Sequence, residues 1–150
     1  MDFDENGYWG HFDHKLDPKF RVSVPVAFRP EEQGEAMRLQ FSKEQERKVV
    51  KVFTSAAFED KFRQVREADL IPKKKQEIIG ALRMSSKEVS INSQGKLSLP
   101  KDWALAIGLE AEGPVKLAAR DGYFLICSEE AFEHIFEADL EIDDGGLGVI

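Results

Sequence analysis

Basic side chains stand in or beside two short turns of this chain, and their chemistry suits contact with a nucleic acid. They are Lys15, Lys19, Arg21 and Lys96, which surround the turn segments 17–20 and 92–95. Lysine and arginine attract phosphates, and the forked guanidinium of arginine can also form paired hydrogen bonds with a guanine edge. Charged turns are also common simply because turns are solvated. The residue types therefore fit either a DNA-contacting surface or an ordinary charged surface.

Catalytic and metal-binding chemistry finds little support in the residue types. His11, Asp13 and His14 carry metal-ligating groups, but alternation along a strand turns His14 away from the face that the other two share. Cys127 ends an apolar segment with no histidine expected beside it, so we interpret it as a core residue rather than a nucleophile. We therefore expect that the chain is not an enzyme, holds no metal or cofactor and has no small-molecule substrate.

The composition fits a globular protein of one domain, or of two small repeats that share a core. The 150 residues are 42% hydrophobic and 33% charged, and no apolar run approaches the ~20 residues of a membrane-spanning helix. Residues 1–6 are acidic and lack the basic and apolar regions of a secretory signal. A lone cysteine cannot form an internal disulfide and favours a reducing compartment. We expect a cytoplasmic protein without a membrane partner.

The formal net charge of −7 hides an uneven distribution along the chain. Residues 72–104 contain seven basic and three acidic side chains, whereas residues 105–150 contain two and eleven. An acidic total can therefore conceal a basic face, which depends on the folded arrangement. Lys73, Lys74 and Lys75 raise a similar question, because a helix start already carries partial positive charge. They suit either an anionic partner or an ordinary solvated face.

An internal repeat organises the chain. Residues 17–25 and 92–100 both read as a turn, a basic residue, an apolar-Ser-apolar triplet and a proline, at an offset of 75 residues. Residues 52–54 and 126–128 match at an offset of 74. We therefore divide the chain into two homologous halves, joined by a basic helix and followed by an acidic tail. The ranges are 8–70 for the first half, 71–81 for the helix, 82–136 for the second half and 137–150 for a disordered tail.

Alternating apolar residues and turn signals predict similar elements in both halves. Each half should contain two strands that pair across its turn, a hairpin and a closing helix. The first half is expected to have strands at 10–16, 22–24, 37–41 and 49–53, with a charged loop at 42–48. The second half is expected to have strands at 88–91, 97–99, 115–120 and 123–127, with a short helix at 101–107.

The longer helices have recognisable starts and apolar faces. Thr54 and Ser128 are predicted N-caps, because their hydroxyls can accept from backbone N–H groups of the first turn. Pro72 suits the first turn of the linking helix, where its missing N–H has no partner to lose. Phenylalanines recur at helical spacing and are predicted to lie in the core: Phe58, Phe62, Phe132 and Phe136.

Two stretches carry a family resemblance. They read Gly10-x-Phe12-x-His14-x-Leu16-Asp17-x-Lys19-x-Arg21-x-Ser23-Val24-Pro25, followed by Phe28-Arg29, and Glu88-x-x-x-Asn92-x-x-Gly95-Lys96-Leu97-x-Leu99-Pro100. Together they resemble the MraZ family, bacterial transcription regulators built from two AbrB-like swapped-hairpin units, over about residues 8–136. The resemblance implies an α+β, mainly β fold, in which two AbrB/MazE-like units form a double-psi-like barrel core with short helices.

The resemblance also implies a function. A member of this family would bind double-stranded DNA at repeated short sites upstream of its own division and cell-wall operon, as a nucleoid-associated, ring-like homo-oligomer. Lys15, Lys19, Arg21 and Lys96 would contact the DNA, and a ring would multiply weak contacts through avidity. We further expect that the two turns lie on the same side of the subunit, with Trp9 or the aromatic helices near subunit contacts.

Three positions depart from the family pattern. Phe20 stands where a glycine usually precedes the arginine, Asn92 replaces an aspartate, and Lys96 replaces an arginine. Phe20 implies either a turn without a positive φ angle or a strained turn. Lys96 keeps the charge but loses the planar fork, so Arg21 should supply base discrimination and Lys96 phosphate attraction. The alternative function is an oligomeric interaction module of the same fold that has lost sequence-specific DNA binding.

Overall fold

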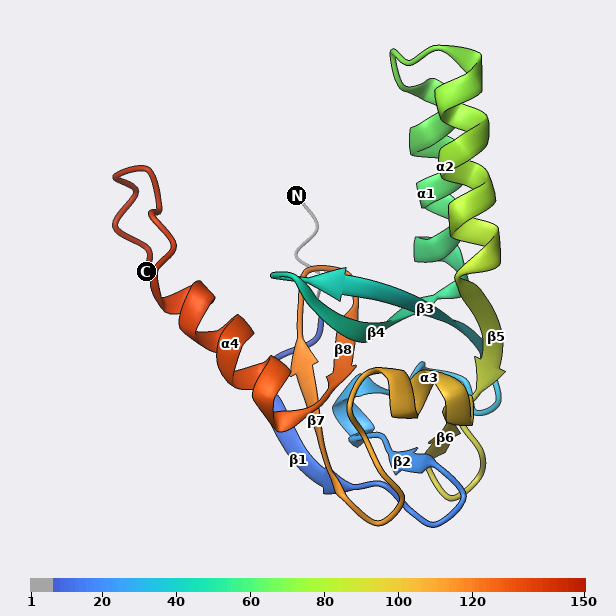
Figure 1. The fold of residues 1–150 in the computed structure, drawn as a ribbon, viewed down its shortest axis with the longest axis vertical. Coiled ribbons are helices and arrows are strands. Elements are labelled where there is room, and N and C mark those ends of the chain that lie inside the picture. The colour runs from blue at the N-terminus through green and yellow to red at the C-terminus, as the bar shows by residue number, and fades with distance from the viewer. Residues whose placement is uncertain (1–6) are drawn as a thin grey trace.

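The fold is α+β, with an antiparallel sheet at its centre and helices that extend from it (Figure 1). The computed structural model describes residues 7–150, so residues 1–6, where the sequence lacks a secretory signal, lie outside the described part. The strands in this range are β1 (His11–Lys15), β2 (Arg21–Ser23), β3 (Ala36–Glu44), β4 (Arg47–Thr54), β5 (Ser86–Ser90), β6 (Lys96–Ser98), β7 (Pro114–Ala119) and β8 (Phe124–Cys127). The helices are α1 (Ser55–Glu67), α2 (Pro72–Met84), α3 (Lys101–Ala106) and α4 (Glu129–Leu140), with a 3-10 turn η1 (Val26–Phe28).

Strand pairing joins the two halves of the chain. Within the described residues, six strands form one sheet in the order β1-β7-β8-β4-β3-β5, and β2 pairs with β6 in a separate two-stranded ribbon. The prediction that strands pair across the turns at 17–20 and 92–95 is therefore wrong, because β1 pairs with β7 and β5 pairs with β3. The exchange has a physical reason: pairing β2 with β6 buries Val22 and Leu97 completely, which an isolated hairpin could not do.

The strands between residues 7 and 150 do not close into the expected barrel. β1 and β5 are the edges of the six-stranded sheet, and the short strands β2 and β6 form a ladder with each other and with neither edge. The β2–β6 ribbon instead packs against the larger sheet through one shared hydrophobic core. That core includes large side chains from both sheets and from η1, among them Val22, Leu97, Leu39, Leu117, Phe124 and Phe28.

Local signals placed both hairpins and the starts of the longer helices correctly. The Thr54 hydroxyl accepts a hydrogen bond from the Ala57 N–H at 3.1 Å, and the Ser128 hydroxyl accepts one from the Ala131 N–H at 3.1 Å. Both predicted N-caps are thus confirmed, as is Pro72 in the first turn of the linking helix. That helix continues to Met84, beyond the predicted end at residue 81.

Two other expectations need correction. The predicted loop at 42–48 is mostly strand, because Gln45 and Glu46 adopt positive φ angles of 47° and 66° and close the β3–β4 hairpin tightly. Phe58 and Phe62 are buried as predicted, whereas Phe136 is 43% exposed. Figure 1 shows the reason, since α4 extends away from the sheet toward the C-terminus.

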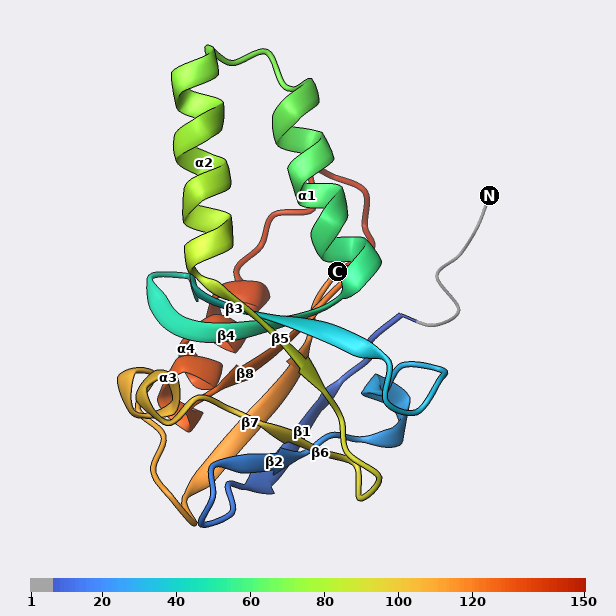
Figure 2. The same ribbon diagram turned by 90° about the vertical axis from the view of Figure 1, so that its right-hand side faces the viewer.

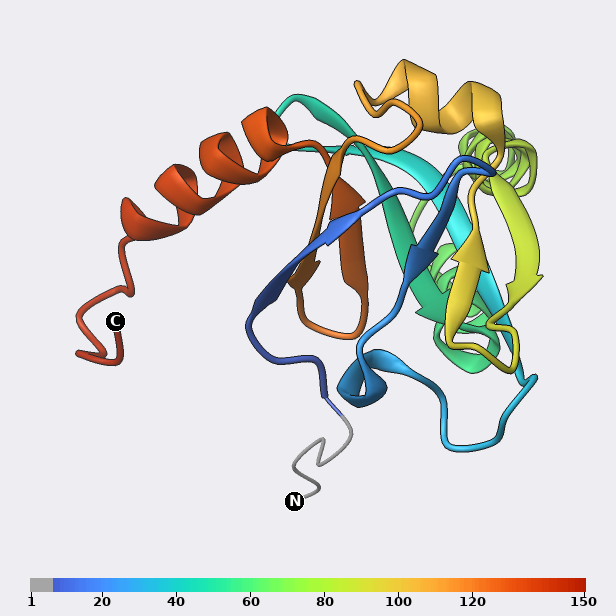
Figure 3. The same cartoon turned by 90° about the horizontal axis from the view of Figure 1, so that it is seen from below.

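The elements divide the molecule into two ends. In Figures 1 and 2, α1 and α2 project as a helical hairpin from one end, and the loops that precede β2 and β6 lie at the other. Both turns therefore lie on the same side of the molecule, away from the helical hairpin, as expected. Figure 3, seen from below, shows β2 and β6 side by side, with α4 and the C-terminal residues extending to the left. The acidic C-terminal segment thus lies away from the ribbon.

Candidate nucleic-acid interface

The β2–β6 ribbon presents one polar face and one apolar face. Its register pairs Val22 with Leu97, whose side chains are both buried in the core. Because side chains alternate along a strand, the flanking residues point to the opposite face. These outward residues are Arg21, Ser23, Lys96 and Ser98. The pairing therefore brings two predicted basic residues, 75 positions apart in the sequence, onto one surface.

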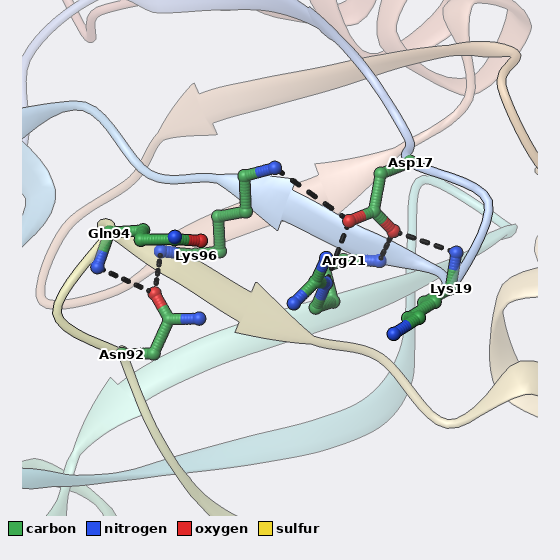
Figure 4. Close-up of polar contacts among 6 residues, drawn as sticks. All are labelled: Asp17, Lys19, Arg21, Asn92, Gln94 and Lys96. Carbon is green, nitrogen blue, oxygen red and sulfur yellow. Dashed lines mark hydrogen bonds and ion pairs between the residues drawn. The ribbon is translucent and has the colours of Figure 1, made fainter.

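The first turn is built on the side chain of Asp17 (Figure 4). Its Oδ1 atom accepts hydrogen bonds from the N–H groups of Lys19 and Arg21, each at 2.8 Å. The Phe20 N–H donates to the Asp17 carbonyl at 3.0 Å and completes the turn. Phe20 has a φ angle of +60°, so the second of the two expected possibilities, a strained turn, is correct. A left-handed conformation costs a residue with a β-carbon roughly 1–2 kcal/mol.

The second turn repeats these hydrogen bonds at Asn92. The amide Oδ1 atom accepts from the N–H groups of Gln94 and Lys96, each at 2.9 Å. The Gly95 N–H donates to the Asn92 carbonyl at 2.9 Å, and Gly95 has a φ angle of +76°. Each bond has its counterpart 75 residues earlier, so the two turns have the same backbone geometry. They hold Arg21 and Lys96 in equivalent positions at the start of their strands.

The Asp17 carboxylate also connects the two turns. Its Oδ2 atom accepts from Arg21 Nε at 2.7 Å and lies 3.8 Å from Lys96 Nζ. Partial burial by itself would raise the pKa of Asp17. Hydrogen bonds from the backbone and side chain of Arg21 and from the Lys19 N–H lower the pKa by more, so the pKa lies below its ordinary value. The carboxylate therefore stays ionised and fixes the direction of the Arg21 guanidinium.

Arg29 joins this surface, although the sequence analysis did not assign it a site. Its Nε donates to the Val24 carbonyl at 2.8 Å, and its guanidinium lies over the α-carbon of Gly95. A β-carbon at position 95 would overlap that guanidinium. Arg29 follows Phe28 in the first motif, which is the one sequence signal that could have pointed to it. Glycine is thus required in the second turn for both its φ angle and this close approach.

The four predicted contact residues are not equally placed. Arg21 and Lys96 share the outer face of the ribbon, with side chains 30% and 31% exposed. Lys19 is exposed in the first turn itself. Lys15 is exposed at the end of β1, paired with Pro114 in the larger sheet, and does not belong to the ribbon. Lys101 lies near the first turn, with Nζ 5.9 Å from the centre of the Phe20 ring.

The lysine run at the start of α2 belongs to a different part of the molecule. α2 begins at the far tip of the helical hairpin, at the opposite end from the ribbon. Lys75 Nζ donates to the Arg66 carbonyl at 2.6 Å and so satisfies a carbonyl in the last turn of α1. This lysine run and the ribbon therefore do not form one continuous basic surface.

Two of the residues considered for metal binding, His11 and Asp13, have structural partners, whereas the Nε2 atom of His14 is buried without a hydrogen-bond partner among the described residues. The His11 ring packs on Phe132 with centroids 4.7 Å apart, and Asp13 forms an ion pair with Lys116. Cys127 is buried, and desolvation raises its pKa to about 12, so its thiol stays protonated. In the part of the chain that the structure describes, no group of three or more His, Cys, Asp or Glu residues is arranged to hold a metal ion. Nor does any helix within that part have the length and apolar character needed to cross a membrane.

Comparisons of the chain with models of known protein families and with curated proteins found no match. The class of protein therefore has to be argued from the motifs and from the geometry of the two turns. That geometry defines a candidate nucleic-acid interface, which is a short ribbon with two equivalent turns and paired basic side chains.

Proposed function

We propose that the chain is a transcriptional regulator that resembles the MraZ family and binds double-stranded DNA through the outer face of the β2–β6 ribbon. One observation carries this proposal. Two turns with the same hydrogen bonds place the partly exposed side chains of Arg21 and Lys96 on one face of the ribbon, although 75 residues separate them. Arginine and lysine held by rigid backbone are suited to contact phosphates and base edges.

The strand order supports the proposed division into two AbrB-like swapped-hairpin units. Residues 8–70 contribute β1 to β4, and residues 82–136 contribute β5 to β8. β1 pairs with β7 and β5 pairs with β3, so each half lends its first strand to the hairpin of the other half. If each strand is replaced by its counterpart in the other half (β1 by β5, β2 by β6, β3 by β7 and β4 by β8), both sheets keep the same strand order, read in reverse. This symmetry is what a repeat with exchanged strands would produce.

The ion pair with Asp17 suits base recognition by Arg21. Asp17 engages the Nε atom of Arg21, and the two terminal nitrogens remain available for a second partner. A guanidinium oriented in this way can present a planar fork to a guanine edge. Lys96 has a single ammonium and would chiefly attract phosphates. Lys15 and Lys19 would add phosphate contacts beside the first turn.

Self-association would strengthen such a small interface. None of the residues Pro72–Met84 of α2 is buried, and Ile71 and Met84 are 68% and 91% exposed. Trp9 is 76% exposed as well. Apolar side chains in such positions fit contacts with further copies of the chain, and a ring-like homo-oligomer would engage several short DNA sites at once. The proposed sites lie upstream of the chain's own division and cell-wall operon.

One observation favours the second candidate, an oligomeric interaction module without sequence-specific DNA binding. The Asp17 carboxylate lies within 4 Å of both Arg21 and Lys96. It partly neutralises the two cations that would face the DNA, and Asn92 and Lys96 stand where the family has aspartate and arginine. In that case the exposed apolar residues would serve assembly alone.

Binding titrations separate the two candidates. The full chain is titrated with a duplex from upstream of its own gene and with a scrambled duplex, by fluorescence anisotropy over a series of salt concentrations. A regulator binds the first duplex at least about tenfold more tightly, and its affinity falls steeply with salt. Equal and weak binding of both duplexes would exclude the regulator and favour the interaction module. Light scattering on the same samples measures the assembly state, and a monomer at micromolar concentration would exclude the ring.

A further inference from the structure

A second concentration of positive charge lies in a hollow of about 370 Å³ beside the helical hairpin. The hollow is bounded by α1, α2 and the adjoining strands β3 and β5, at the base of the helical hairpin, which projects from the sheet away from the turns of the ribbon. Its polar lining consists of Arg38, Arg66, Arg83, Ser86 and Glu59. Three guanidiniums from three separate elements thus surround one space, together with a single carboxylate.

An aromatic ring lies within cation–π distance of each of these guanidiniums. The guanidinium carbons of Arg66 and Arg83 lie 5.8 and 5.6 Å from the centre of the Phe62 ring. The guanidinium carbon of Arg38 lies 5.9 Å from the centre of the Phe58 ring. Both rings are buried at the floor of the helical hairpin. A guanidinium that contacts a ring through its face keeps the N–H groups of its edge available for an acceptor.

The charges of the hollow are poorly compensated within the chain. Among residues 7–150, Arg66 and Arg83 form no ion pair with a carboxylate, and the contact of Arg38 with Glu88 is 3.8 Å long. The side chain of Glu59 supplies the one negative charge of the lining. Positive charge therefore exceeds negative charge in the hollow, and the mutual repulsion of the guanidiniums would be relieved by a bound anion.

We propose that this hollow binds a phosphate group. Arg66 and Arg83 would donate charge-assisted hydrogen bonds from opposite sides, and Arg38 and the Ser86 hydroxyl would bind the remaining oxygens. Ligand pockets in proteins typically span about 300–1,000 Å³, so this hollow suits a small phosphorylated molecule or inorganic phosphate. A DNA phosphodiester has the same chemistry, but the hollow and the ribbon are formed by separate elements of the chain.

Titration of the full chain with inorganic phosphate and then pyrophosphate, followed by NMR at constant ionic strength, tests the site. Arg66→Gln and Arg83→Gln should each weaken binding by about 10-fold to 100-fold, since each removes hydrogen bonds to a charged acceptor. Arg63→Gln is the matched control, because Arg63 is another exposed arginine of α1 whose partners, Asp60 and Glu67, lie outside the hollow. It should bind phosphate as the unmodified chain does.

A variant that binds phosphate more tightly tests the site in a way that misfolding cannot imitate, because a misfolded chain would lose affinity. Glu59→Gln removes the single carboxylate of the lining and should tighten phosphate binding by about threefold or more. Shifts that do not saturate, or an equal weakening in Arg63→Gln, would overturn the proposal. An added DNA duplex that displaces phosphate would identify a phosphodiester as the natural source, and no displacement would identify a small phosphorylated molecule. Because these measurements do not involve Arg21 or Lys96, their failure would leave the proposed function untouched.

Discussion

The turns at 17–20 and 92–95 share one backbone geometry and differ in all four side chains. Both begin with an oxygen acceptor that binds the N–H groups two and four residues later. The first has a charged acceptor and a phenylalanine at the positive-φ position, whereas the second has a neutral acceptor and a glycine. The backbone therefore sets the shape of both turns, and the side chains decide what each turn does.

The two turns therefore differ in the interactions that their side chains make and in their backbone strain. In the first turn, Asp17 uses one oxygen to hold the backbone and the other to bind Arg21, while Phe20 bears the cost of a left-handed conformation. In the second turn, Asn92 holds only the backbone, and Gly95 adopts its φ angle freely beneath Arg29. Lys96 consequently has its acidic partner in the other turn. The comparison teaches that the two turns form one electrostatic unit centred on Asp17.

The largest effect is expected when the second turn loses its glycine. Gly95→Ala should destabilise the fold by about 2–3 kcal/mol, because it adds a left-handed alanine and displaces the Arg29 guanidinium from its hydrogen bond with Val24. Chemical denaturation measures the loss. Gly80→Ala in α2 is the control, since nothing lies near that position, and alanine should stabilise a helix by up to about 1 kcal/mol. Similar stabilities for the two variants would contradict the role of the close approach.

Removing the two basic side chains one at a time should distinguish base recognition by Arg21 from phosphate attraction by Lys96. Arg21→Ala should cost about 1–3 kcal/mol on the preferred duplex and reduce the preference over a scrambled one. Lys96→Ala should weaken binding to both duplexes alike and reduce the salt slope by roughly one ion. Anisotropy titrations of both variants over a salt series measure these changes. Equal losses on both duplexes for Arg21→Ala would show that this residue does not read sequence.

Exchanging the acceptors tests whether Asp17 is the electrostatic centre. Asp17→Asn keeps an oxygen that can hold the turn but removes the charge between Arg21 and Lys96, so affinity for any duplex should rise about threefold to tenfold. Asn92→Asp is the reciprocal variant and should lower affinity by a similar factor, because it places a carboxylate beside Lys96. The same titrations apply. A loss of affinity in Asp17→Asn would mean that the orientation of Arg21 by Asp17 contributes more to DNA affinity than removal of the negative charge.

The smallest effect concerns pH. The pKa of Asp17 is lowered in the folded state, so its ionised form stabilises the fold above the unfolded pKa, about 3.9. That contribution is lost as the pH falls through the folded pKa. The difference in unfolding free energy between the natural chain and Asp17→Asn should therefore be constant above about pH 5 and shrink below pH 4. A difference that grows in acid would have the wrong sign.

The sequence predicted features with local causes and missed those that depend on distant burial. Thr54, Ser128 and Pro72 mark helix starts through their own hydrogen-bonding chemistry, which explains why those predictions were correct. The partners of β1, β2, β5 and β6 depend instead on which pairing buries Val22 and Leu97. Nothing in a short window of sequence contains that information.

The candidate site shows the same limit. Arg21 and Lys96 were found through the repeat, which the sequence displays directly. The position of Arg29 over Gly95 and the shared carboxylate of Asp17 were not found, because both contacts cross between segments whose pairing was predicted wrongly. The arginines of the hollow were missed for a similar reason, since Arg38, Arg66 and Arg83 come from three elements with no common spacing.

The exchange of strands between the halves also bears on how the chain folds during its synthesis. β1 ends at Lys15, yet its partner β7 starts at Pro114, so the first strand must wait for about a hundred further residues to leave the ribosome. β2 waits in the same way for β6. Pairings between such distant segments close large loops and are slow to form. The β3–β4 hairpin and the α1–α2 pair are units able to form early, and the β2–β6 ribbon is assembled only when strands of both halves are available.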